Sequence, residues 1–85
     1  MKHAGPTALT TLEPLLAEIR RRAGLKESRP GVFYRNSKAF LHFHEDPTGL
    51  FADIRGPEDA DFLRFPVNSA RDREALIAHI DQSLA

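Results

Sequence analysis

Two histidines and an aspartate stand at spacings that could hold a metal ion. His42 and His44 alternate with the two-residue period of a β-strand, so both side chains point to one face of a sheet. A hairpin turn at residues 46–49 would place Asp53 directly opposite His42 on the next strand. Imidazole and carboxylate groups are ligands that zinc accepts. His42, His44 and Asp53 are therefore candidate metal ligands, although the sequence predicts no resident cofactor.

The same side chains have other uses. A histidine pair on a strand is often only a half-buried aromatic pair, and His42 beside Asp53 could act as an oriented general base. The nucleophiles that would accompany such a base are missing, because the chain has no Cys and no Gly-x-Ser-x-Gly motif. A Gly-rich phosphate loop is also absent. We therefore expect no catalytic residues and a protein that works by binding.

The strand face that carries these histidines, here called the histidine face, also carries aromatic residues. Turns at residues 36–37 and 46–49 predict its members to be Phe33, Phe40, His42, His44, Phe51, Asp53 and Arg55. The opposite face, the expected core, would hold Val32, Tyr34, Leu41, Phe43, Ala52 and Ile54. Large exposed apolar patches usually mark interfaces. We expect a second copy of the chain to cover the histidine face in a homodimer, and the alternative is a groove for a protein or small-molecule ligand.

A helix must precede this sheet. Apolar residues recur at alternating spacings of three and four, which is the pattern of one helical face: Leu9, Leu12, Leu16, Ile19 and Ala23. Thr11 is expected as the N-cap because Pro14 is tolerated only in the first turn. Gly24 is expected as the left-handed C-cap. Residues 1–8, which include His3, are expected to form a flexible terminus.

The apolar period changes to two after a turn at residues 28–31. Strands are expected at residues 32–35, 39–45, 50–55 and 62–65, with Pro66 marking a sheet edge. Ser69 and Asp72 resemble a capping box and begin a last helix. These elements predict one α+β domain over residues 1–85: an N-terminal helix, a four-stranded antiparallel meander and a C-terminal helix, with both helices on one sheet face.

Charge is balanced overall but not along the chain. Twelve Lys and Arg residues match twelve Asp and Glu residues, yet residues 1–44 carry a net +5 and residues 45–85 a net −5. A basic patch could bind nucleic-acid phosphates, and its members would be Arg20, Arg21, Arg22, Lys26, Arg29, Arg35 and Lys38. Pairing with the acidic half is the interpretation we favour. The acidic cluster of Glu58, Asp59 and Asp61 lacks the spacing of a calcium loop and is expected to be an exposed turn.

Composition excludes several classes. Hydrophobic residues make up 41% of the chain, too many for a disordered tail, and the lack of Cys excludes a disulfide scaffold. No apolar run approaches a membrane span, and residues 1–6 do not resemble a signal peptide. A cytoplasmic location is expected. Nine Arg against three Lys, with frequent Ala, is typical of a GC-rich bacterial source.

The central hairpin resembles that of a known group. Residues 31–41 read as an apolar strand, a short turn ending in Lys38, then a small residue and Phe40. This segment, together with the order of elements, is similar to the MmcQ/YjbR group of small bacterial proteins, although Ser37 stands where that group tends to have Gly. The resemblance implies an α+β fold. Because members are suspected of binding DNA, it also implies that Arg35 and Lys38 could meet phosphate.

Overall fold

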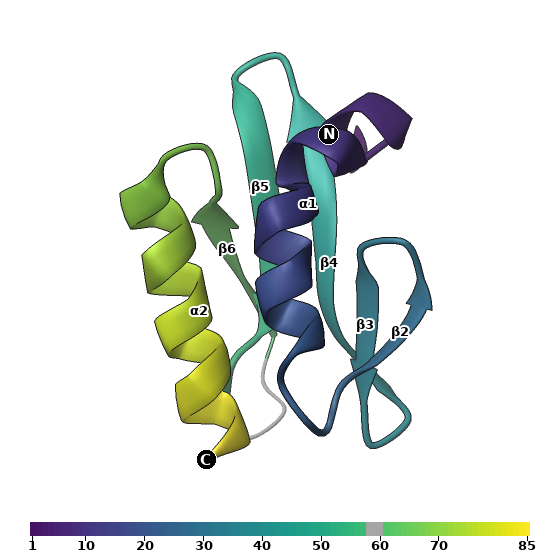
Figure 1. The fold of residues 1–85 in the computed structure, drawn as a ribbon, viewed down its shortest axis with the longest axis vertical. Helices are drawn as coiled ribbons and strands as arrows, with labels where there is room; N and C mark the ends of the chain where they lie inside the picture. The colour runs from purple at the N-terminus through teal and green to yellow at the C-terminus, as the bar shows by residue number, and fades with distance from the viewer. Residues whose placement is uncertain (58–60) are drawn as a thin grey trace.

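Two helices cover one face of an antiparallel sheet in the computed structural model of this chain (Figure 1). The structure describes residues 1–57 and 61–85, which hold two helices and six strands. The elements are β1 (Lys2–His3), α1 (Pro6–Arg20), β2 (Lys26–Arg29), β3 (Val32–Arg35), β4 (Lys38–Asp46), β5 (Gly49–Arg55), β6 (Phe62–Pro66) and α2 (Ala70–Leu84). The predicted α+β class is confirmed, with a helix at each end and more strands than expected. Among the described residues, no helix is long and apolar enough to cross a membrane.

One of the additional strands is at the N-terminus. β1 pairs antiparallel with the end of β4 that extends beyond β3, with Lys2 opposite Glu45 and His3 opposite His44. β4 has nine residues and β3 only four, so β4 offers free backbone groups there, and these need partners. The expectation that residues 1–8 form a flexible terminus is therefore wrong.

The other additional strand is β2, at one end of the strand order β2-β3-β4-β5-β6. Its sequence, Lys-Glu-Ser-Arg, has no apolar alternation, which is why the sequence did not predict it. The strand forms because Gly31 adopts a positive φ of 76° and closes a hairpin between β2 and β3. The N–H of Gly31 donates to the carboxylate of Glu27 at 2.9 Å, which fixes this turn.

α1 begins earlier than expected. Pro6 lies in the first turn of α1, where a backbone N–H would make no hydrogen bond within the helix. Gly5, and not Thr11, is the N-cap. Pro14 therefore lies inside the helix, where it removes one backbone hydrogen bond. The helix tolerates this loss because its inner face is buried against the sheet through Ala8, Leu12, Leu15, Leu16 and Ile19. The helix ends at Arg20, so Gly24, with φ of 93°, lies in the following turn and is not the C-cap.

The strand pairing confirms one predicted register and corrects the other. β4 pairs with β5 as expected, with His42 opposite Asp53 and His44 opposite Phe51. β3 pairs with β4 through the expected turn at residues 36–37, but the register then shifts so that Phe33 faces Leu41. Phe40 is the extra residue of this β-bulge, and a bulge changes which side chains share a face.

The bulge moves two aromatic residues into the core. Phe33 is 1% exposed and Phe40 is 4% exposed, and both belong to the core cluster between the sheet and the helices. Their predicted place on the histidine face is therefore wrong, whereas Val32 and Tyr34, which were expected in the core, are only half-buried. The core cluster comprises Leu12, Leu15, Leu16, Ile19, Phe33, Phe40, Leu41, Phe43, Ala52, Ile54, Val67, Leu76 and Ile80.

The last helix begins as predicted. The hydroxyl of Ser69 accepts the N–H of Asp72 at 3.0 Å, and the Asp72 carboxylate accepts the N–H of Ser69 at 3.1 Å. This capping box sets the start of α2, which buries Leu76 and Ile80. β6 is the last strand of the sheet, as the proline at its end suggested.

Candidate functional site

Three histidines meet on the histidine face. His42 and His44 lie on β4, and β1 adds His3 directly across from His44. The ring centroids are 4.7 Å apart for His42 and His44, 5.0 Å for His3 and His44, and 5.8 Å for His3 and His42. One nitrogen from each ring can be chosen so that all three lie within 4.8 Å of one another. We call His3, His42 and His44 the trihistidine cluster.

Sequence reasoning missed His3. Two residues are too few to show a strand period, and no neighbouring residue marks Lys2–His3 as a strand. The position depends on long-range contacts instead. The N–H of Ala4 donates to the carbonyl of Phe43 at 3.0 Å, and the N–H of Gly5 donates to Oε2 of Glu45 at 2.6 Å. These bonds hold the N-terminal segment against β4 and present His3 beside its two partners.

Asp53 lies beside the cluster, bound to an arginine. It is 8% exposed, and its two carboxylate oxygens accept hydrogen bonds from Nε and Nη2 of Arg64 at 2.8 and 2.9 Å. These bonds hold the pKa of Asp53 below its ordinary value, so the group is an anion. Oδ2 also lies 3.2 Å from Nε2 of His44, outside hydrogen-bond geometry.

The two β4 histidines are held in the neutral form. Burial lowers the pKa of His42, with a further contribution from the neighbouring His44, and burial likewise lowers the pKa of His44. Among the described residues, Nδ1 of His42 and both ring nitrogens of His44 are buried without a hydrogen-bond partner. A neutral imidazole has one nitrogen lone pair free to accept a proton or bind a metal ion. The lowered pKa and the unpartnered nitrogens leave both His42 and His44 able to coordinate a metal ion.

An aromatic residue and a cation border the cluster. The ring of Phe62 lies 5.0 Å from that of His42, and the guanidinium carbon of Arg55 lies 4.8 Å above the centre of the Phe62 ring. Phe62 is 37% exposed. Sequence reasoning placed Arg55 here but missed Phe62 and Arg64, because the register of β6 depends on a connection through residues that show no strand pattern. Phe51, also predicted, lies opposite His44 and is half-buried.

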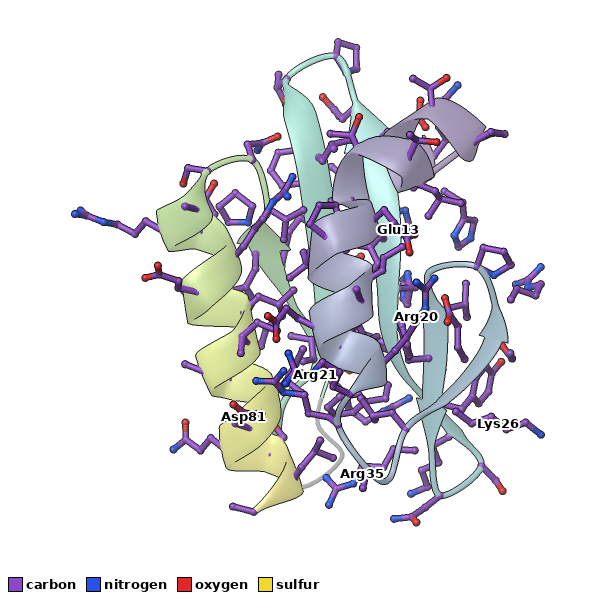
Figure 2. All side chains as sticks on the ribbon, in the orientation of Figure 1. Glu13, Arg20, Arg21, Lys26, Arg35 and Asp81 are labelled. Atoms are coloured by element: carbon purple, nitrogen blue, oxygen red, sulfur yellow. The ribbon has the colours of Figure 1, made fainter. Side chains whose placement is uncertain are left out.

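The predicted basic patch is largely neutralised within the chain. Arg20 donates to Glu13 and Glu27 at 2.6 Å, and Arg22 donates to Glu18 and Asp81. Figure 2 shows Arg20 and Glu13 on α1 and Asp81 on α2. Arg21 lies 3.8 Å from Glu18. Of these partners, Asp81 belongs to the acidic half that we expected to pair with the arginines, whereas Glu13, Glu18 and Glu27 belong to the first half.

The remaining basic candidates lie on the strands β2, β3 and β4. Arg35 donates to the backbone carbonyl of Ser83 at 2.7 Å and so binds the end of α2. Lys26 and Arg29 are exposed at the two ends of β2, and Lys38 is exposed at the start of β4. Of the acidic cluster, Glu58 and Asp59 lie outside the described residues, and Asp61 is exposed.

No family model matches the chain, and no curated protein and no solved structure matches it significantly. The resemblance of the central hairpin to MmcQ/YjbR proteins therefore stays a prediction. Function has to be inferred from the side chains that the fold brings together. Of these, the trihistidine cluster brings three metal-ligating side chains within 4.8 Å, and two of them, His42 and His44, have buried ring nitrogens without a hydrogen-bond partner.

Proposed function

We propose that this protein binds a divalent transition-metal ion, such as zinc, through His3, His42 and His44. The observation that carries the proposal is the meeting of three imidazole nitrogens within 4.8 Å on two paired strands. Imidazole nitrogen is a preferred ligand of zinc, copper and nickel. Two nitrogens on one tetrahedral zinc lie roughly 3.4 Å apart at Zn–N distances of about 2.0–2.1 Å. Ligation of zinc would therefore draw the three nitrogens closer together than the 4.8 Å within which they now lie.

The surroundings support coordination over simple ring packing. Because their pKa values are lowered, His42 and His44 stay unprotonated at a lower pH than an ordinary histidine does. Protons therefore compete less with a metal ion for these two rings. Asp53 supplies a negative charge beside the cluster, which is favourable near a cationic metal, although its pairing with Arg64 offsets part of that charge. Buried ring nitrogens without a hydrogen bond are costly, and a bound metal ion would offset that cost at His42 and His44.

Titration calorimetry with ZnCl₂ tests the proposal. The wild-type chain is expected to bind one zinc per chain. His3→Ala and His44→Ala are each expected to weaken binding by roughly 100-fold, since apparent zinc-binding energies of about 10–16 kcal/mol are shared among about four ligands. His79→Gln is the matched control, because His79 lies on α2 beside Phe65 and outside the cluster. Equal zinc affinity in all four proteins would exclude the trihistidine site.

Self-association through the histidine face is a second candidate function. No helix covers that face among the described residues, and Phe62 is exposed on it. The face would then bind a second copy of the chain, as the sequence suggested. Sedimentation of the wild type and of Phe62→Asp, both in EDTA, tests this, and a wild-type monomer at high concentration would reject it. The expectations of a bacterial and cytoplasmic protein stay proposals from composition alone.

A further inference from the structure

The trihistidine cluster supplies three ligands where a tetrahedral metal takes four. Structural zinc sites complete the set with a fourth protein side chain, whereas sites that act on ligands keep one position open. The nature of the site therefore depends on the nearest other donor. Among the described residues, that donor is Asp53, whose Oδ2 lies 3.2 Å from Nε2 of His44.

Asp53 already forms an ion pair with Arg64. Asp53 and Arg64 stand opposite each other in the pairing of β5 with β6, and the guanidinium holds both carboxylate oxygens. Bidentate bonds of this kind are short, directional and about twice as strong as neutral hydrogen bonds. A move of Asp53 onto the metal would sacrifice them and leave the Arg64 charge without its partner.

Asp53 is better placed to orient His44 than to bind the ion. A carboxylate beside one ring nitrogen of a ligating histidine fixes the tautomer and leaves the other nitrogen for the metal. Oδ2 of Asp53 lies 3.2 Å from Nε2 of His44 without hydrogen-bond geometry, so a turn of the ring on metal binding would let the Nε2–H donate to Asp53 and leave Nδ1 to coordinate. That Nδ1 is buried and has no hydrogen-bond partner among the described residues.

We infer that the metal bound by His3, His42 and His44 keeps one coordination position open to a small anion from solution, with Asp53 as a positioning residue for His44. This inference rests on the proposed metal-binding function. The histidine face carries no helix among the described residues, and His3 is exposed, so a ligand can approach from solvent. The class of ligand follows from charge, because three neutral imidazoles leave the charge of a divalent ion uncompensated, and that charge favours an anion at the fourth position.

Azide titration of the cobalt-loaded protein tests this inference. Co²⁺ takes the same ligands as zinc and has visible absorption bands that depend on its coordination. The wild-type protein with one bound Co²⁺ is expected to change its visible spectrum saturably on addition of sodium azide. A spectrum that azide leaves unchanged, with Co²⁺ still bound, would overturn the open position and leave the metal-binding proposal standing. A failure of Co²⁺ and Zn²⁺ to bind at all would overturn both.

Asp53→Asn separates a positioning residue from a ligand. A positioning role predicts that Asp53→Asn weakens Co²⁺ binding by about 10–100-fold and keeps the azide response. An azide response that appears in Asp53→Asn and not in the wild type would show that Asp53 is the fourth ligand, and would overturn the inference. Asp81→Asn is the control carboxylate change, since Asp81 lies on α2 and binds Arg22. If Asp53→Asn does not fold, the wild-type titration still decides the question.

Discussion

The ring of His3 stacks on the ring of His44, with centroids 5.0 Å apart and an angle of 27° between the planes. The two residues are far apart in the sequence and are joined only by the antiparallel pairing of β1 with β4. A site that contains both can form only when the N-terminal segment is docked on the sheet. Metal binding and the docking of residues 2–3 are therefore coupled in our proposal.

The first prediction concerns the residue that holds the N-terminal segment. Glu45→Gln replaces the carboxylate that accepts the Gly5 N–H at 2.6 Å and lies 3.5 Å from the Lys2 ammonium. A Gln amide oxygen accepts from the Gly5 N–H more weakly than a carboxylate does, so His3 would lie beside His44 less often. Zinc affinity is expected to fall by about fivefold. Glu74→Gln, an exposed change on α2, should leave zinc affinity unchanged in the same calorimetric titration. An unaltered affinity in Glu45→Gln would argue against the coupling.

The second prediction concerns stability. A ligand that binds only the folded state stabilises it by about 2.7 kcal/mol at a concentration one hundred times its Kd. For a domain of this size, that corresponds to a rise in Tm of roughly 10 °C or more. Thermal unfolding followed by circular dichroism should show this rise with zinc and its reversal by EDTA. His44→Ala, with a Kd about one hundred times higher, should show a rise of only about 2–3 °C at the same zinc concentration. An equal rise in that variant would place the zinc elsewhere.

The third prediction tests the β-bulge. Phe33 is 1% exposed and Phe62 is 37% exposed, although a regular ladder would have turned Phe33 away from the helices. Phe33→Ala is expected to lower the free energy of unfolding by about 3–5 kcal/mol. Phe62→Ala should lower it by less than about 1 kcal/mol. Urea denaturation measures both, and Phe33→Leu provides a milder change should Phe33→Ala fail to fold. Equal effects at the two positions would contradict the observed register.

The fourth prediction is a pH dependence. The hydrogen bond from Arg20, and then the one from the Gly31 N–H, hold the pKa of Glu27 below its ordinary value. Because the folded pKa is the lower one, Glu27 stabilises the fold above its ordinary pKa, and this contribution is lost as the pH falls through the folded pKa. Glu27→Gln should cost about 0.5–1 kcal/mol at pH 7, allowing for solvent screening of a partly exposed pair.

The wild type and Glu27→Gln should converge in stability as the pH falls below about 4.3, the ordinary pKa of glutamate. Urea midpoints measured between pH 3 and pH 7 follow the difference. Glu74→Gln is again a suitable control, because its side chain is exposed on α2. A difference that stays constant down to pH 3 would show that Glu27 acts through its shape and not its charge.

Local patterns in the sequence determined most of the elements. The spacing of leucines indicated α1, the turns at residues 36–37 and 46–49 set the hairpins, and Ser69 with Asp72 marked the start of α2. The register of β4 against β5, and with it the position of Asp53 opposite His42, was also predictable. All of these depend on interactions between residues close in the chain, or on a hairpin whose turn fixes the pairing.

Only the tertiary structure decided the rest. The bulge at Phe40 places Phe33 and Phe40 in the core and not on the histidine face. Burial against the helices is favoured because it removes both aromatic rings from water. The docking of β1 on β4 brought His3 to His44, and the pairing of β6 with β5 brought Arg64 to Asp53. These contacts join distant parts of the chain, because the backbone N–H and C=O groups of each strand need hydrogen-bond partners. Such a requirement leaves no local pattern in the sequence, so the third histidine became visible only in the fold.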